Sequence, residues 1–204
     1  MAVRPIIAVL ASLSVSGCLA GAVGANDAPA ETFLLPTEAA VGEPSSSRGP
    51  QVLVPEPITF DVLSSPRVVV RVGEREVQYL GNTRYGDTLT RLTQLKLKRA
   101  LESGRGIGAA AIPGEGLAID FQVVSDIRAF EIRVSPSEVA FVSIGVKLLN
   151  DRSGNVVAQR VFQSSASVVL PADPERQNEA YVAALDEALE GALIEIRDWV
   201  SARV

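Results

Sequence analysis

Alternating hydrophobic and polar residues predict several short strands in the first half of the chain. Residues 32–36 (TFLLP) form the first such run, which ends at a proline. Residues 51–80 contain two or three more runs, of which the β-branched run 68–72 is the clearest. Gly73 and Glu74 follow it and predict a hairpin turn into the next strand.

A longer β region follows between residues 114 and 170. The hydrophobic side chains of segment 114–134 change parity near residues 126–129, which predicts a β-bulge or bend there. Segment 137–170 predicts a hairpin that turns at the sequence DRSGN. One face of its first strand is hydrophobic throughout, with Ala140, Val142, Ile144, Val146 and Leu148.

Two segments have the hydrophobic spacing of amphipathic helices. After a break at Gly81 and Asn82, the first helix is predicted to run to about Ser103, with Asp87 or Thr88 as its N-cap. The second is predicted from Asp173, its N-cap, to the end of the chain. Its apolar stripe consists of Tyr181, Leu185, Ala188, Ala192, Ile196 and Trp199.

The predicted order of elements is therefore β-β-β-α-β-β-β-α within one domain, residues 31–204. Adjacent hairpins favour antiparallel pairing, and amphipathic helices bury their apolar stripes against a sheet. We expect a single α+β domain in which an antiparallel β-sheet carries two amphipathic helices packed on one face.

The first residues have the layout of a secretory signal peptide. Arg4 supplies a positive charge, residues 6–15 form a short apolar core, and Ser16 and Gly17 are small, as a cleavage site requires. About ten apolar residues cover only about half of the hydrocarbon core of a bilayer, so this segment is too short for an ordinary spanning helix. Residues 1–17 are therefore predicted to be a signal peptide.

Cys18, the only cysteine of the chain, follows this segment directly. The sequence VSGC resembles a bacterial lipobox, which implies that Cys18 becomes the first residue and is lipidated. Residues 18–30 are then a lipidated N-terminus and a flexible tether rich in Ala and Gly. The alternative is an ordinary cleaved signal, cut near the sequence AGAVGA, with an incidental cysteine. Leu19, where some lipoproteins have aspartate, favours the outer membrane by resemblance to bacterial lipoproteins.

The composition limits the chemistry that the chain can perform. It contains no histidine, which excludes Ser-His-Asp and Cys-His catalytic systems. One cysteine without histidine does not supply the ligand set of a zinc site, so neither a metal nor a cofactor is expected. The formal net charge of −5, with both signs interspersed, argues against nucleic-acid binding.

Several local motifs resemble functional sites. Residues 104–109 have the letters of a G-x-G-x-x-A dinucleotide loop, but a helix precedes them where that loop needs a strand. A glycine-rich connection is therefore expected. Arg84 and Asp87 are expected in helix capping and an ion pair, and Trp199 in the core. Three acidic pairs are candidate acid/base partners, but we interpret them as surface groups: Glu74/Glu76, Asp120/Asp126 and Asp186/Glu187.

Three segments carry a resemblance to a known family: 64–104, 113–132 and 146–162, which include the phrase DIRAF at 126–130. In order and coverage they resemble the ABC-type transport auxiliary lipoproteins, which partner MCE-domain proteins in Mla- and Pqi-like lipid-transport systems. Family members usually have Arg-Trp before the first helix, where this chain has Arg84-Tyr85. None of the matching motifs is catalytic.

The resemblance implies a non-enzymatic lipoprotein at the periplasmic face of the outer membrane of a Gram-negative bacterium. Its implied partner is the MCE-domain protein of an inner-membrane ABC transporter, and its implied cargo is phospholipid or another lipid. The resemblance also allows a homo-oligomer. The competing hypotheses are a structural lipoprotein that braces an outer-membrane complex, and an envelope hydrolase using Ser-Lys or carboxylate chemistry.

Overall fold

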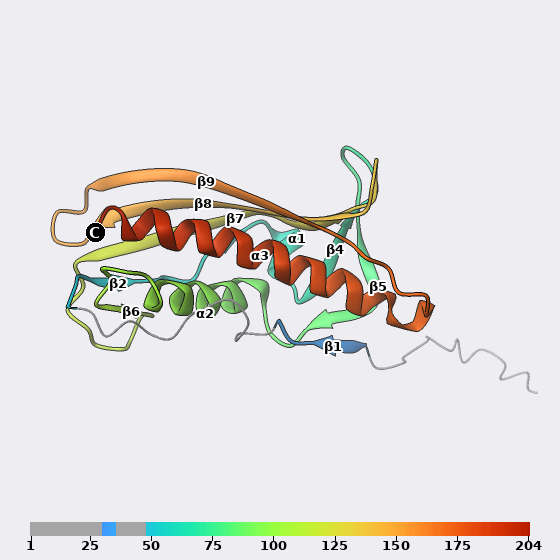
Figure 1. Ribbon diagram of the computed structural model, residues 1–204, viewed down its shortest axis with the longest axis horizontal. Coiled ribbons are helices and arrows are strands. Elements are labelled where there is room, and N and C mark those ends of the chain that lie inside the picture. The colour runs from blue at the N-terminus through green and yellow to red at the C-terminus, as the bar shows by residue number, and fades with distance from the viewer. Residues whose placement is uncertain (1–29, 36–47) are drawn as a thin grey trace, which may run out of the picture.

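The longest strands of the fold lie in its second half. They are β7 (Phe121–Arg133), β8 (Val139–Asn150) and β9 (Val156–Ser167), which form an antiparallel meander (Figure 1). The structure is a computed structural model that describes residues 30–35 and 48–204. The predicted hydrophobic face of β8 is buried, which confirms the pattern expected for this strand.

A β-bulge interrupts β7 where the sequence predicts a change of parity. Ile127 pairs with Ile144 and Ala129 pairs with Ser143, so Arg128 has no partner residue on β8. The extra residue shifts the pleat by one position, and Phe130 and Ile132 therefore bury on the same face as Ile127. The predicted bulge is confirmed.

The other edge of β7 is shared by three short strands. β2 (Gln51–Leu53), β3 (Ile58–Thr59) and β4 (Arg67–Arg71) pair with successive segments of β7, and all three run parallel to it. The sheet is therefore mixed, and the prediction of an antiparallel sheet is wrong. Residues 72–120 separate β4 from β7, which is long enough for the crossover connection that parallel neighbours require.

The remaining strands extend this sheet to nine strands among the described residues. β5 (Val77–Tyr85) pairs antiparallel with β4, β1 (Glu31–Phe33) pairs parallel with β5, and β6 (Ala109–Ala111) pairs parallel with β2. Five strands and the short helix α1 (Asp61–Ser64) precede the first long helix, and four strands follow it. The predicted order, with three strands on each side of that helix, is therefore wrong.

β5 continues through Gly81 and Asn82, where the sequence predicts a break. Its pairing with β4 is nevertheless irregular: Arg67 pairs with Arg84 and Val69 with Tyr79, so residues 80–83 lie opposite Val68 alone. Asn82 adopts a φ of 53°, in the left-handed region. The expected break is thus an irregularity within a strand, and it creates space between β4 and β5.

The two long helices lie close to their predicted positions. α2 (Leu89–Glu102) begins after Thr88, whose hydroxyl accepts a hydrogen bond from the Arg91 N–H. A short 3₁₀ turn, η1 (Pro174–Arg176), capped by Asp173, precedes α3 (Gln177–Ser201). α3 lies along β7, β8 and β9, and α2 packs beside α3 (Figure 1).

The apolar stripe of α3 forms much of the core with the sheet. Trp199 is 7% exposed and contacts Phe162 of β9 edge-on, with ring centroids 5.6 Å apart, as expected for a core residue. No helix in the described part of the chain is long and apolar enough to span a membrane.

Candidate functional site

Cys18, the predicted lipidation site, lies outside the described residues. The description begins at Ala30, and β1 begins one residue later. A tether that ends at residue 30 therefore enters the domain at the first residue of β1, Glu31, which pairs with Thr83 of β5. The lipidation of Cys18 stays a prediction.

Members of the acidic pairs that are candidate acid/base partners form other contacts in the structure. Asp120 accepts a hydrogen bond from the Gln51 N–H, and Asp126 pairs with Arg128 at 2.5 Å. Asp186 is buried against Lys96, so its interpretation as a surface group is wrong, whereas its neighbour Glu187 is exposed. Within residues 30–35 and 48–204, no three potential metal ligands are grouped.

The buried ion cluster, formed by Lys96, Asp186 and Glu190, joins α2 to α3. The Lys96 ammonium donates a hydrogen bond to Asp186 Oδ1 and lies 3.9 Å from Glu190 Oε1. The side chains of Lys96 and Asp186 are only 4% and 11% exposed. Two carboxylates thus compensate one buried ammonium, as charges removed from water require.

The buried ion cluster changes the acidity of its neighbours. Burial and the negative charge of Asp186 raise the pKa of Glu190, and these effects outweigh the opposing effect of Lys96. Burial and Asp186 also raise the pKa of Tyr85, so this phenol is neutral at physiological pH. Each charged group of the cluster lies within ion-pair distance of another across the helix interface. The cluster therefore acts as a structural connection between the helices.

A second carboxylate is buried on the opposite side of the sheet. Glu131 accepts two hydrogen bonds from Arg71, at 2.7 and 2.8 Å, and one from Arg133 at 2.9 Å. The Arg133 guanidinium also stacks on Phe141, 3.5 Å from the ring centroid. The two arginines satisfy the carboxylate and link β4 to β7.

The glycine-rich segment 104–109 connects α2 to β6, as the sequence predicts. The Gly108 N–H donates a hydrogen bond to the Pro50 carbonyl, and a Cβ at Gly108 would collide with the backbone of Gly49. The glycines therefore permit two backbone segments to approach closely.

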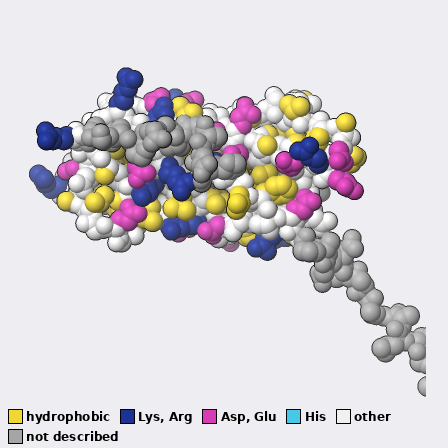
Figure 2. Space-filling view, turned by 60° about the horizontal axis from the view of Figure 1, so that its bottom comes forward, with side chains coloured by type: hydrophobic (Ala, Val, Ile, Leu, Met, Phe, Trp, Pro, Cys, Tyr) yellow, Lys and Arg dark blue, Asp and Glu magenta, His cyan; other side chains and the backbone are white. Residues whose placement is uncertain are grey.

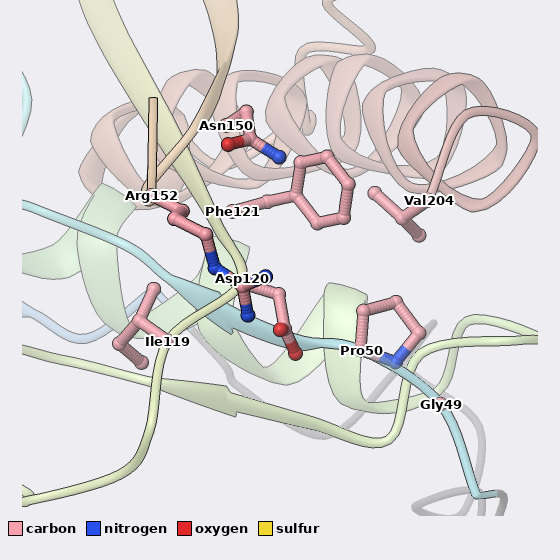
Figure 3. A pocket seen from close by; sticks show the side chains of 8 residues that line it. All are labelled: Gly49, Pro50, Ile119, Asp120, Phe121, Asn150, Arg152 and Val204. Atoms are coloured by element: carbon pink, nitrogen blue, oxygen red, sulfur yellow. The ribbon is translucent and has the colours of Figure 1, made fainter. Parts of the chain in front are cut away.

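One shallow cleft lies at the end of the molecule that carries the C-terminus. It has a volume of about 550 Å³, and its lining includes Asp120, Phe121, Arg152 and Val204. Figure 3 shows the Phe121 ring between Asn150 and Val204, with Arg152 on the same side of the ring as Asn150. Asp120 is the single acidic side chain among the residues that line this cleft, and it accepts the Gln51 N–H, so the lining contains no pair of acidic side chains.

The second cleft, the β4–β5 cleft, lies near the opposite end of the molecule. It has a volume of about 530 Å³ and is lined by residues of β4 and β5, by Ser65 and Pro66, and by Ala30. Its charged side chains are Arg67 and Arg84, which are both exposed.

The expected ion pair of Arg84 with Asp87 is wrong, because the Asp87 carboxylate accepts the Thr88 N–H and forms no ion pair within the described ranges.

Basic side chains also project from the C-terminal end of the molecule (Figure 2). Arg105 follows α2, Arg152 lies in the turn between β8 and β9, and Arg203 is next to the C-terminus. Arg203 donates a hydrogen bond to the Trp199 carbonyl. This end lacks the opposed strand arginines of the β4–β5 cleft.

Sequence reasoning missed both the buried ion cluster and the β4–β5 cleft. Lys96 is four residues after Leu92 and seven after Leu89, so its position on the buried stripe of α2 was readable from the sequence. The pairing of Arg67 with Arg84 was not readable, because it depends on the irregular register of β5.

Comparison with protein families gives one match over most of the domain. A sequence model of the family described as the ABC-type transport auxiliary lipoprotein component matches residues 33–196. No protein with a curated description matches the sequence.

Solved structures share the fold. Protein XCC0632 from Xanthomonas campestris is 25% identical, with a TM-score of 0.72, and the match covers 85% of this chain and 96% of that one. The hypothetical protein CT253 from Chlamydia trachomatis is 12% identical, with a TM-score of 0.54 and coverage of 76% and 98%. The second likeness shows the fold alone.

Proposed function

Because the chain belongs to the family of ABC-type transport auxiliary lipoprotein components, we propose that it is a non-enzymatic component of a lipid-transport system of the cell envelope. In this proposal Cys18 carries the lipid that anchors the chain at the periplasmic face of the outer membrane. The chain receives phospholipid from, or passes it to, the MCE-domain protein of an inner-membrane ABC transporter. It thereby contributes to envelope integrity.

The family match carries this proposal, since it extends over residues 33–196, nearly all of the domain. The physical arrangement is consistent with it. ATP would be hydrolysed at the other membrane, so this chain needs an anchor and binding surfaces rather than a reactive group. Residue 30, where the predicted tether ends, leads directly into β1.

Partner capture tests the proposal. The chain, tagged at its C-terminus, is crosslinked in intact cells and purified from detergent-solubilised membranes, and its partners are identified by mass spectrometry. We expect an MCE-domain protein and the subunits of an ABC transporter. Repeated recovery of the chain without them would reject the transport role.

The same purification separates transport from a purely structural role. A conduit component should co-purify with phospholipid in amounts above those of an outer-membrane lipoprotein of similar abundance, used as the control. A brace that does not handle lipid should show no such excess.

The anchor is tested by Cys18→Ala. Without the thiol no acyl chain can be attached, so we expect an uncleaved or soluble periplasmic form that no longer incorporates labelled palmitate. Two or more acyl chains give stable membrane attachment where one is marginal, so the change of fraction should be nearly complete. Leu19→Asp is the matched control, which should still be labelled. A Cys18→Ala protein that still labels and stays in the membrane would contradict lipidation at this residue.

A further inference from the structure

The β4–β5 cleft places two arginines directly opposite each other. Arg67 of β4 and Arg84 of β5 are partner residues across the antiparallel pair, and both line the cleft. The next residue, Tyr85, is 1% exposed and lies in the core, so Arg84 points to the other face of β5. The two guanidinium groups therefore share one face of the sheet.

Like charges directly opposite on neighbouring strands destabilise a sheet unless something compensates them. Neither Arg67 nor Arg84 forms an ion pair with any carboxylate among residues 30–35 and 48–204. This differs from Arg71 and Arg133 on the same sheet, which share the carboxylate of Glu131. The β4–β5 cleft thus has two positive charges and no counter-charge from the described chain.

Other contacts hold this cleft in shape. The Arg67 guanidinium stacks on Tyr79, 3.7 Å from the ring centroid, and the Tyr79 hydroxyl donates to the Val62 carbonyl at 3.3 Å. The Thr83 hydroxyl donates to the Gly81 carbonyl, which fixes the irregular segment of β5. One guanidinium is therefore oriented before any ligand arrives, which lowers the entropy cost of binding.

We propose that the β4–β5 cleft binds the phosphate group of a phospholipid headgroup through Arg67 and Arg84. Guanidinium groups donate paired, charge-assisted hydrogen bonds to phosphate oxygens. The two positive charges exceed the single negative charge of one phosphodiester by one. A phosphate between them converts their repulsion into a shared attraction.

The place of the cleft favours a lipid as the source of the phosphate. Ala30, the last residue before β1, lines the cleft. A predicted tether of about a dozen residues has a flexible span of about 20 Å, so an anchored chain keeps the cleft near the headgroup region. Such tethering gives a high effective concentration, and a modest intrinsic affinity is then sufficient. The identification of the phosphate as that of a lipid rests on the proposed function.

Thermal unfolding of the purified full-length mature lipoprotein, in a nonionic detergent, tests this site. Four probes are compared at equal ionic strength: sodium chloride, inorganic phosphate, glycerophosphoglycerol and dihexanoyl phosphatidylglycerol. Because a ligand of the native state raises the unfolding midpoint, we expect both phosphodiester probes to raise it relative to chloride.

The variant Arg67→Gln/Arg84→Gln should bind the phosphodiesters at least about tenfold more weakly, since it loses the charge-assisted bonds to phosphate. Arg105→Gln/Arg152→Gln removes the same charge at the C-terminal end and should bind like the wild type. Equal loss in both variants would show a general charge effect and overturn the site. An unchanged midpoint with all probes, or unchanged binding by the first variant, would also overturn it.

Two further outcomes separate the sources and the two proposals. A response to inorganic phosphate without a response to the phosphodiesters would reject a lipid headgroup as the ligand. Phosphodiester binding by a chain that captures no transporter leaves the cleft standing and rejects the proposed function. Capture of the transporter without phosphodiester binding rejects the cleft alone.

Discussion

Lys96 and the arginine pair of the β4–β5 cleft carry positive charge in opposite environments, one buried and one exposed. Lys96 is removed from water between two helices and has two carboxylates within ion-pair distance. Arg67 and Arg84 stay exposed and have no such partner among the described residues. A buried charge requires an opposite charge from the chain itself, whereas an exposed charge is solvated by water and stays available to a ligand. Substitutions at Lys96 should therefore change the stability of the fold, and substitutions at Arg67 and Arg84 should change ligand binding.

The largest effect on stability is expected for Lys96→Met. The variant leaves Asp186 and Glu190 in the helix interface without a positive charge. Removing one member of a buried ion pair costs about 3–5 kcal/mol, because the remaining charge is uncompensated. The measurement is the free energy of unfolding in urea, followed by the fluorescence of Trp199, the only tryptophan.

Lys98→Met is the matched control on the same helix. Lys98 forms ion pairs with Glu102 and Glu115, but its side chain is 22% exposed. Loss of such partly solvated pairs costs about 0–1 kcal/mol. If the two variants lost the same stability, the comparison between buried and exposed charges would fail.

Glu131→Gln should have an intermediate effect. The carboxylate is 4% exposed and accepts three hydrogen bonds from Arg71 and Arg133. The amide keeps the shape but replaces one acceptor with a donor that faces a guanidinium. Loss of hydrogen bonds between charged groups should reduce the free energy of unfolding by about 1.5–3 kcal/mol.

The control for this variant is Asp126→Asn, which lies on the same strand. Its partner Arg128 is 48% exposed, so the pair is largely solvated. Chemical denaturation should show a loss below about 1 kcal/mol for Asp126→Asn. A larger loss than that of Glu131→Gln would mean that burial does not decide the cost.

A smaller, pH-dependent effect is expected for Glu190→Gln. The folded protein raises the pKa of Glu190, so the native state binds this proton more tightly than the unfolded state. The associated stability is present below the ordinary pKa of 4.5 and is lost as the pH rises through the folded pKa. Relative to the wild type, the variant should gain stability between pH 4 and pH 7, by at most about 1 kcal/mol.

Denaturation of both proteins at each pH measures this difference. Glu195→Gln, on an exposed part of the same helix, serves as the control and should give a smaller change with pH. A Glu190→Gln variant that loses stability relative to the wild type as the pH rises would show that the Lys96 attraction outweighs burial.

The sequence predicted those parts of the fold that depend on neighbouring residues. Parity along 114–134 located the bulge beside Arg128, and the spacing of apolar residues located α2 and α3. The parallel partners of β7 could not be predicted, because β2 and β3 are only three and two residues long and meet β7 more than sixty residues later. Such short strands have no measurable period.

The candidate sites divide in the same way. The position of Lys96 on the apolar stripe of α2 is a local feature of the sequence, so its burial could be predicted from helical spacing. The pairing of Arg67 with Arg84 depends on residues 80–83 lying opposite Val68 alone, which is a long-range irregularity. Helical or strand periodicity does not encode such a register shift.

The smallest expected effect concerns the coupling between Arg67 and Arg84. A double-mutant cycle with Arg67→Gln and Arg84→Gln in chloride buffer should give a repulsive coupling of about 0.2–1 kcal/mol, the range for directly opposed side chains. Arg67→Gln alone also loses its stacking on Tyr79, which is worth about 0.5–1 kcal/mol at exposed sites, so only the cycle isolates the pair. When the cycle is repeated in saturating glycerophosphoglycerol, the coupling should become attractive, because both arginines then bind one phosphate. An attractive coupling in chloride would show that the chain itself already compensates the pair, and the contrast with Lys96 would then disappear.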